Sequence, residues 1–307
     1  MIYTVTFNPA IDYVIHMDQP VEIGETNRSR EESLFFGGKG VNVSLILGQL
    51  NMENRALGFL AGFTGAAIAD GIQAQGVQGD FIFLPKGTSR INVKLKSEKE
   101  TEINAQGPDI DKDSLDALFQ QFSHFEDGDC LVLAGSIPKS LPNDIYEQIL
   151  ERLKEKNILA VVDATGDLLK KVLPYHPFLI KPNKAELGEL FQTRVETSEE
   201  IVTYAKKLQE MGARNVLISL GGDGAMLVSE DGDILSIGVP TGKAINTVGS
   251  GDSMVAGFLT GYLQSNNYET ALALGTACGS ATAICQGLAD RATIDAQLEK
   301  IHRGEFQ

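Results

Sequence analysis

Residues 246–253 read Asn-Thr-Val-Gly-Ser-Gly-Asp-Ser, a glycine-rich turn followed by an aspartate and a serine. The apolar run 254–263 after it predicts a helix whose free N–H groups and positive dipole end face this turn. Such a helix start binds anions, so Asp252 could take a proton from a hydroxyl while backbone amides hold a phosphoryl group. An aspartate that only caps a helix is the alternative, and this motif alone does not decide between them.

A second glycine turn, Phe-Phe-Gly-Gly-Lys-Gly-Val-Asn, covers residues 35–42. Gly38 and its neighbours permit close approach of the backbone to a ligand, Lys39 adds a positive charge, and Asn42 follows about one helical turn later. This pattern suits a phosphorylated or polyhydroxylated ligand. It is not a Walker motif, because glycine follows Lys39 where serine or threonine would be needed. A flexible turn with a solvated lysine remains the alternative.

Three further motifs are ambiguous when taken singly. Asp12, at the end of the first apolar run, could accept hydrogen bonds from sugar hydroxyls or only form a turn. Asn183 and Glu186, just after Lys181, could order waters around Mg²⁺ or form a capping box at a helix start. The loop 219–224, Ser-Leu-Gly-Gly-Asp-Gly, could contact a nucleotide or be a hairpin turn.

Composition limits the class of ligand. The chain has 307 residues, 43% of them hydrophobic, and a formal net charge of −15, which argues against nucleic acid and anionic membrane as partners. A phosphate ligand would therefore depend on basic groups and amides within a Debye length of about 8 Å. Three cysteines without a Cys-x-x-Cys pair and no evident signal peptide lead us to expect a reduced, cytoplasmic location.

The elements that must position these residues alternate along the chain. Apolar strand patterns and helical patterns interleave, which predicts a mostly parallel sheet with helices on both faces and ligands at the carboxyl ends of its strands. The strands are expected at 2–7, 56–59, 130–134, 159–163, 178–181 and 216–220, and the helices near 41–49, 66–75, 144–154, 198–211 and 271–289. The last of these would carry Cys278 and Cys285 on one face.

Two stretches break this alternation, at about 13–36 and 88–104. Their alternating apolar residues predict extended segments that no helix follows, so we expect a small β-lid over the ligand edge of the main sheet. A plain extension of the sheet is the alternative. Because no repeat or linker is evident, we expect residues 1–307 to form a single domain with this lid inserted.

Taken together, these motifs resemble the phosphofructokinase B carbohydrate kinases of the ribokinase-like superfamily over essentially the whole chain. The resemblance rests on the strand ending Asn8–Asp12, the Gly-Gly-Lys-Gly turn, the motif 183–186 and the turn 249–252. The runs Ser-Arg-Ile-Asn-Val-Lys-Leu at 89–95 and Thr-Glu-Ile-Asn at 101–104 are similar to those of members that phosphorylate fructose 1-phosphate. The resemblance to this family implies an α/β fold, which is a ribokinase-like three-layer sandwich with a small β-lid.

The resemblance also implies an activity, which is Mg²⁺- and ATP-dependent phosphorylation of the 6-hydroxyl of fructose 1-phosphate to give fructose 1,6-bisphosphate and ADP. Asp252 would be the base, and the amides of Gly249, Ser250 and Gly251 would hold the transferred group. The implied substrate-binding residues are Asp12, Gly38, Lys39, Asn42, Arg90, Arg28 and Asn104. Those implied for ATP are Lys181, Asn183, Glu186, Ser219, Gly221, Gly222, Gly224, Val248 and Ser253, with Asn183 and Glu186 holding Mg²⁺ through water.

The chain departs from the common family pattern at two positions, Asn246 for aspartate and Ser250 for alanine. The alternative activities are tagatose-6-phosphate kinase and then 6-phosphofructokinase, since few contacts distinguish these ketohexose phosphates. A sugar-phosphate sensor without turnover is the non-enzyme alternative, although the base and its glycines are present. The edges of the lid could pair with a second subunit, as a homodimer, or stay solvated.

Overall fold

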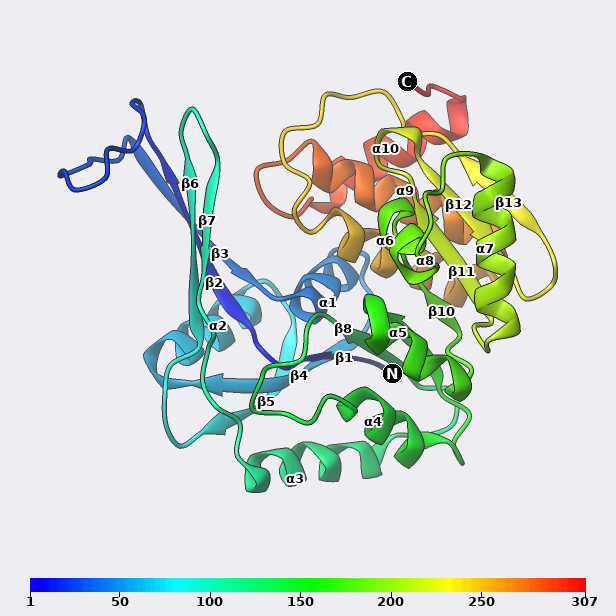
Figure 1. The fold of residues 1–307 in the computed structure, drawn as a ribbon, viewed down its shortest axis with the longest axis horizontal. Coiled ribbons are helices and arrows are strands. Elements are labelled where there is room, and N and C mark those ends of the chain that lie inside the picture. Colours follow the sequence, from blue (N-terminus) through cyan, green and yellow to red (C-terminus); the bar gives the residue numbers. More distant parts are fainter.

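The larger of two sheets contains nine strands in the order β13-β12-β11-β10-β9-β8-β1-β4-β5, in a computed structural model that describes residues 1–307 (Figure 1). Neighbouring strands pair in parallel except at β11–β12 and β12–β13, which are antiparallel. The strands are β1 (Ile2–Thr6), β4 (Asn54–Ala61), β5 (Gln78–Leu84), β8 (Cys130–Ala134), β9 (Leu159–Asp163), β10 (Leu179–Ile180), β11 (Asn215–Ser219), β12 (Ala225–Val228) and β13 (Ile234–Ile237). The predicted mostly parallel α/β sheet is confirmed.

Helices cover both faces of this sheet, which gives three layers. One face packs against α1 (Lys39–Gln49), α2 (Gly62–Ala74), α8 (Ser250–Ser265), α9 (Tyr268–Ala283) and α10 (Arg291–Arg303). The other packs against α3 (Lys112–Gln121), α4 (Ile145–Leu153), α5 (Gly166–Val172), α6 (Lys184–Leu190) and α7 (Ser198–Glu210). None of these helices is both long enough and apolar enough to cross a membrane.

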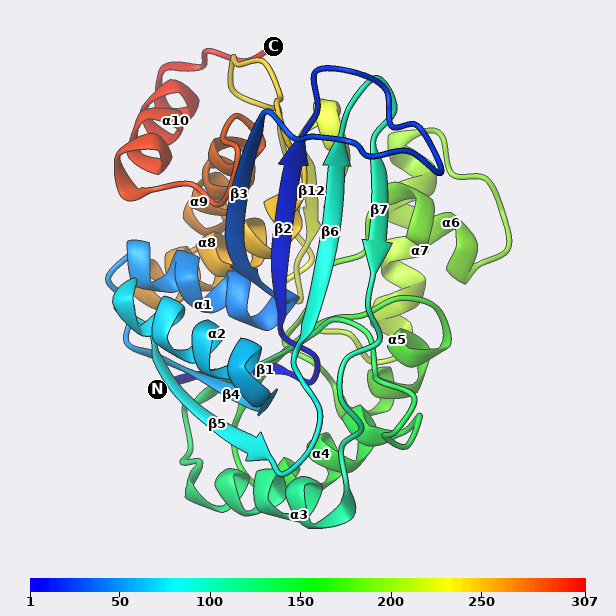
Figure 2. The ribbon, with the colours of Figure 1, turned by 90° about the vertical axis from the view of Figure 1, so that its left-hand side faces the viewer.

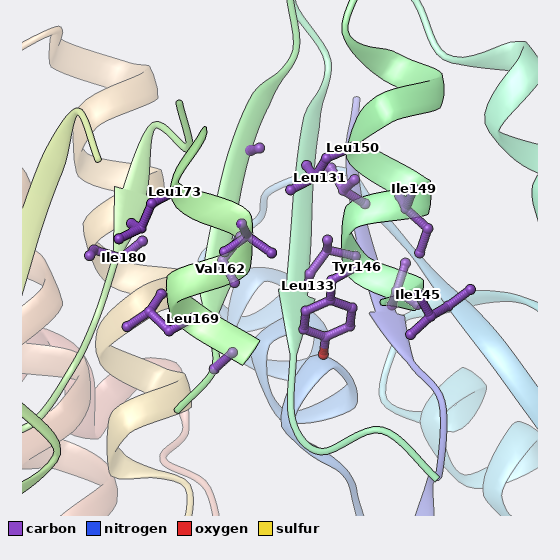
Figure 3. Packing of buried hydrophobic residues seen from close by; sticks show 14 of the residues in the cluster. Leu131, Leu133, Ile145, Tyr146, Ile149, Leu150, Val162, Leu169, Leu173 and Ile180 are labelled. Atoms are coloured by element: carbon purple, nitrogen blue, oxygen red, sulfur yellow. The ribbon is translucent and has the colours of Figure 1, made fainter. Parts of the chain in front are cut away.

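Alternate residues of strand β8 face the two helical layers on opposite sides of the sheet. Leu131 and Leu133 point to one face and belong to the cluster that includes Tyr146 of α4 (Figure 3). Cys130 and Val132, which alternate with them, point to the cluster on the opposite face. All four side chains are buried, as expected for a central strand covered on both sides. Burial of each leucine contributes about 1.5–3 kcal/mol, so these alternating positions help to fix the register of the strand.

The last long helix ends earlier than the sequence predicts. Helix α9 stops at Ala283, so the expected helix over 271–289 is wrong in its final turns. Cys285 therefore lies beyond the helix and is half-buried, whereas Cys278 is buried within it. Burial raises the pKa of the Cys278 thiol to about 12 and that of Cys130 to about 11, so both thiols stay protonated at neutral pH.

A second, four-stranded sheet stands beside the carboxyl edge of the first and is called the small sheet below (Figure 2). Its order is β3-β2-β6-β7, with β2 (Ala10–His16), β3 (Glu31–Gly37), β6 (Arg90–Lys96) and β7 (Thr101–Asn104). The central pair β2–β6 is parallel and the outer pairs are antiparallel. Residues 17–30 form the long connection at its free end rather than a continuous hairpin.

Candidate active site

A cleft of about 680 Å³ lies between the small sheet and the carboxyl edge of the main sheet. Strands β2, β6 and β9, the starts of α1, α6 and α8, the β11–β12 turn and one side of α9 all contribute to its wall. It brings together most of the residues singled out from the sequence, namely Asp12, Gly38, Lys39, Asn42, Arg90, Lys181, Asn183, Glu186, Ser219, Gly221, Gly222, Gly224, Val248, Gly249, Ser250, Gly251 and Asp252. Parallel sheets gather ligand-binding residues at this edge.

The turn before α8 needs glycine at Gly249, the residue before its first helical turn. Its φ of 80° is left-handed, and a Cβ there would lie 2.7 Å from Leu288. The amides of Gly249, Gly251 and Asp252 make no hydrogen bond within the protein, whereas the amide of Ser250 donates to the carbonyl of Thr247 at 3.2 Å. The amide of Ser250, one of the three that the resemblance implies as donors, is therefore engaged within the turn, whereas the amide of Asp252 is free.

Asp252 itself is only 6% exposed, and Oδ2 of its carboxylate accepts a hydrogen bond of 2.8 Å from Nδ2 of Asn42. Burial, followed by the negative charge of Asp163, raises the pKa of Asp252 to about 7. The hydrogen bond from Asn42 and the charges of Lys39 and Lys181 act in the opposite direction. A carboxylate with this pKa is a stronger base than an exposed aspartate, and it is well matched to proton transfer near neutral pH.

Asp163 was not identified as a site residue from the sequence. It ends strand β9, is 3% exposed, and pairs with Nζ of Lys39 at 3.2 Å and Nζ of Lys181 at 3.5 Å. Burial alone would lower the pKa of Lys39, but Asp163 and Asp252 outweigh burial and raise it above its ordinary value. Since Asp163 follows an apolar strand at the ligand edge, the reasoning that selected Asp12 would have found it too.

Lys181 lies directly against the turn before α8. A Cβ at Gly251 would be 2.9 Å from the Lys181 ammonium, so glycine at this position leaves room for the charge beside the free amides. Two buried carboxylates, two ammonium groups and three unpaired N–H groups therefore meet at the start of one helix. This arrangement can remove a proton from a hydroxyl and stabilise negative charge on a phosphoryl group a few ångströms away.

Asn183 and Glu186 form the capping box that the sequence left as an alternative, and both line the cleft as well. Each side chain accepts a 2.8 Å hydrogen bond from the other residue's amide, through Oδ1 of Asn183 and Oε2 of Glu186. Oε1 of Glu186 makes no hydrogen bond within the protein. No group of three or more acidic, histidine or cysteine side chains could hold a metal ion directly. A single free carboxylate oxygen beside a cleft fits Mg²⁺, which keeps most of its waters.

The loop after β11 forms the hairpin turn that was one of its alternatives, and it also lines the cleft. Residues 219–224 form the turn of the antiparallel β11–β12 hairpin, and four of them line the cleft. Across the cleft, the small residues Gly279, Ser280 and Ala283 of α9 line the wall. This end of the cleft can accommodate a flat apolar group such as a nucleotide base.

A second cavity of about 450 Å³ adjoins the cleft and shares with it Gly38, Lys39, Arg90 and the Asp163 carboxylate, which pairs with Lys39. The Nε–H of Arg90 donates to the carbonyl of Asn8 at 3.0 Å, which leaves its terminal nitrogens free for a ligand. Burial lowers the pKa of Arg90, and Asp12 partly offsets this. Gly38 precedes α1 with a φ of 118°, and a Cβ there would lie 2.7 Å from Thr6. The cavity therefore offers an anion two cations beside a helix start.

Three residues selected from the sequence do not line the cleft. Arg28 is exposed in the connection 17–30 at the free end of the small sheet, and Asn104 is exposed on its edge strand β7. Ser253 is fully buried, and its hydroxyl contacts Thr282 at 2.8 Å and the Gly249 carbonyl at 2.9 Å, which ties α8 to α9. Two other residues, Asn92 and Lys94, line the cleft but were not selected as site residues. Both lie in the run 89–95 on which part of the family resemblance rests.

Comparison with known proteins agrees with this geometry. The family model for pfkB family carbohydrate kinases matches residues 5–294. A Bacillus subtilis protein named 1-phosphofructokinase is 46% identical over 288 residues, 94% of each chain, and a Bacillus licheniformis protein named D-tagatose-1-phosphate kinase is 35% identical over 98% of each. The crystal structure of phosphofructokinase-2 from Escherichia coli with substrates and products has a TM-score of 0.92 at 25% identity, covering 98% of this chain and 99% of that one. The chain therefore belongs to the pfkB family of carbohydrate kinases.

Proposed function

We propose that this chain transfers the γ-phosphoryl group of ATP to the 6-hydroxyl of fructose 1-phosphate, giving fructose 1,6-bisphosphate and ADP. The observation that carries the proposal is the buried Asp252 carboxylate, which has a pKa of about 7 and stands beside free amides at the start of α8. Membership of a carbohydrate kinase family and 46% identity to a protein named 1-phosphofructokinase support it.

In the proposed reaction, ionised Asp252 accepts the proton of the 6-hydroxyl as that oxygen attacks the γ-phosphorus. Asn42 keeps the carboxylate pointed at the acceptor through its 2.8 Å hydrogen bond. The bond from phosphorus to the bridging oxygen breaks, and ADP leaves. The amides of Gly249, Gly251 and Asp252, with the ammonium of Lys181, stabilise the charge on the oxygens of the transferred group.

Glu186 and Asn183 are proposed to hold Mg²⁺ through its waters. The ion would supply neutralising charge to the β- and γ-phosphates, which the protein cannot fully provide in a cleft with several acidic groups. Residues Ser219, Gly221, Gly222, Gly224 and Val248 would then border the nucleotide, with the base against the wall formed by α9.

The phosphate already on the sugar is assigned to the adjoining cavity, with Lys39 and Arg90 as its cations. The whole chain has a net charge of −15, so binding of this phosphate depends on these local groups. Asp12 and Gly38 would contact the sugar between the two ends. The small sheet would act as a lid that closes on the sugar and excludes water, within one domain covering residues 1–307.

D-Tagatose 1-phosphate is the second candidate substrate, because a relative named for that activity matches 98% of this chain at 35% identity. The two sugars carry their phosphate at the same end and differ in the configuration of one ring hydroxyl. Release of ADP should be measured with fructose 1-phosphate, tagatose 1-phosphate, fructose 6-phosphate and tagatose 6-phosphate under the same Mg·ATP conditions. We expect the highest kcat/KM for fructose 1-phosphate. Sugar binding without ADP release would instead identify a sensor.

We also propose that two copies associate through the small sheet. Its outer face is apolar along neighbouring strands, and Leu34, Ile91 and Ile103 are exposed on it. Helix α2 covers only the base of this face, through Phe36. A second copy could cover the remaining apolar surface, which a monomer would leave in water.

A further inference from the structure

Asn92 occupies the centre of the small sheet at the level of the sugar site. It lies opposite Asp12 of β2 on one side and opposite Asn104 of β7 on the other, so the three side chains form one row across the sheet. Asn92 lines the cleft and is 7% exposed, whereas Asn104 is exposed and does not line it. The row therefore contains two paired asparagines on the same face of the sheet, of which Asn92 is buried at the cleft and Asn104 is exposed outside it.

The amide of Asn92 has a fixed orientation. Its Nδ2 donates a 2.9 Å hydrogen bond to Oδ1 of Asp12, and only the NH₂ end of the amide can face that carboxylate. The other end, Oδ1, is buried and has no hydrogen-bond partner in the protein. Buried carbonyl oxygens without a donor are rare, because water is lost without replacement. Four other buried amide oxygens of this chain also lack a partner, but Asn92 is the one of these amide residues that lines the cleft, where a bound ligand can supply the donor.

The chemistry of the row identifies that donor. Asp12 and the free end of Asn92 offer only acceptors, so a phosphate, which carries no donor when fully ionised, does not fit between them. A sugar hydroxyl does. Arg90 lies two residues earlier on the same strand and the same face, about 6–7 Å along it. One strand thus presents a cation for the phosphate and, a short distance away, an acceptor for a ring hydroxyl.

On the basis of the proposed function, we infer that Asn92 is a specificity-determining residue whose Oδ1 accepts a hydrogen bond from a ring hydroxyl of the bound ketohexose phosphate. Asp12 accepts from the same or the adjacent hydroxyl, and the Asn92–Asp12 bond keeps the two acceptors aligned. A sugar without that hydroxyl leaves the buried oxygen unpaired, which is the strongest way for a site to reject an analogue.

The test is a thermodynamic cycle between the protein and the sugar. Wild type, Asn92→Ala and the matched control Asn104→Ala are compared with fructose 1-phosphate and with its 3-deoxy and 4-deoxy analogues at saturating Mg·ATP. We expect Asn92→Ala to lower kcat/KM for fructose 1-phosphate by about 10- to 100-fold and Asn104→Ala to change it by less than about twofold. With one of the two deoxy sugars, Asn92→Ala should cause little further loss, because the hydroxyl and its acceptor form one interaction.

Two results would overturn the inference. One is an equal loss in Asn92→Ala with all three sugars, which would mean that Asn92 acts only by supporting Asp12 or the strand. The other is a loss no greater than that of the Asn104→Ala control. Thermal unfolding checks that the variants are folded, and Asn92→Ser replaces the alanine variant if that one is not. If wild type does not turn over fructose 1-phosphate, the proposed function fails separately. The cycle is then run on the ketohexose phosphate that wild type phosphorylates, or on sugar binding by calorimetry if it phosphorylates none.

Discussion

Replacement of Asp252 by asparagine should make the stability of the protein less dependent on pH. The folded pKa of Asp252 is about 7, against an ordinary value of 3.8, so the folded protein holds this proton more tightly than the unfolded chain does. The stability contributed by a group with a raised pKa is present at low pH and is lost as pH rises through the folded pKa. Asparagine keeps the shape and the neutral state but does not titrate.

The size of the effect follows from the pKa. About two pKa units separate pH 5 from the folded value, and each unit corresponds to about 1.4 kcal/mol. Between pH 5 and pH 8, the free energy of unfolding of Asp252→Asn relative to wild type should therefore rise by about 2–3 kcal/mol. Other titrating groups cancel in this difference, apart from those that contact Asp252.

The assay is urea unfolding of both proteins at pH 5, 6, 7 and 8 without ligands. Asp231→Asn, at an exposed aspartate outside the cleft, is the matched control, and its difference from wild type should stay within about 0.5 kcal/mol over this range. The reasoning would be refuted if the free energy of unfolding of Asp252→Asn relative to wild type stayed equally constant over this range or fell as pH rises. That result would mean that Lys39 and Lys181 stabilise the Asp252 carboxylate more than burial and Asp163 destabilise it.

Two other predictions follow from the same geometry. Asp163→Asn removes the charge that helps to raise the pKa of Asp252, so the acidic limb of the profile of kcat/KM against pH should move to lower pH. The value of kcat should also fall, because Lys181 loses its partner. An acidic limb that does not move in steady-state assays would contradict this role of Asp163. Ile103→Glu places a charge on the outer face of the small sheet and should convert a dimer into a monomer, as measured by light scattering. The control Ile234→Glu, at an exposed isoleucine of β13, should leave the dimer intact. A molecular mass equal to that of wild type in both variants would exclude this interface.

Much of the fold follows from local sequence signals. Strand β8 is a continuous apolar run between Asp129 and Gly135, and β9 is an apolar run that ends in Asp163. The predicted ranges 130–134 and 159–163 match the structure. Helix ends were harder to predict. The sequence 284–289 keeps an apolar pattern, but it turns away from α9 to pack against the small sheet, where Gly287 contacts Phe35. A tertiary contact of this kind leaves no local signature.

The meeting of residues in one cleft was predictable where a motif carries its own geometry, as at the glycine turns around Lys39 and Asp252. It was not predictable where the role of a residue comes from distant partners. Asp163 matters because Lys39, 124 residues earlier, converges on it. The resemblance pointed to Arg28 and Asn104 by residue type, but it could not show that both are exposed and do not line the cleft. The burial of Asn92 beside Asp12 follows only from the pairing of β2 with β6.

The central claim is that Asp252 is the base in phosphoryl transfer to fructose 1-phosphate. The most direct measurement is the rate of ADP release by wild type and Asp252→Asn at saturating Mg·ATP and fructose 1-phosphate, with sugar binding followed by calorimetry. We predict that the asparagine variant binds the sugar phosphate with similar affinity and loses kcat by a factor of about 10² to 10⁴. Normal binding with most of the turnover retained would contradict the claim.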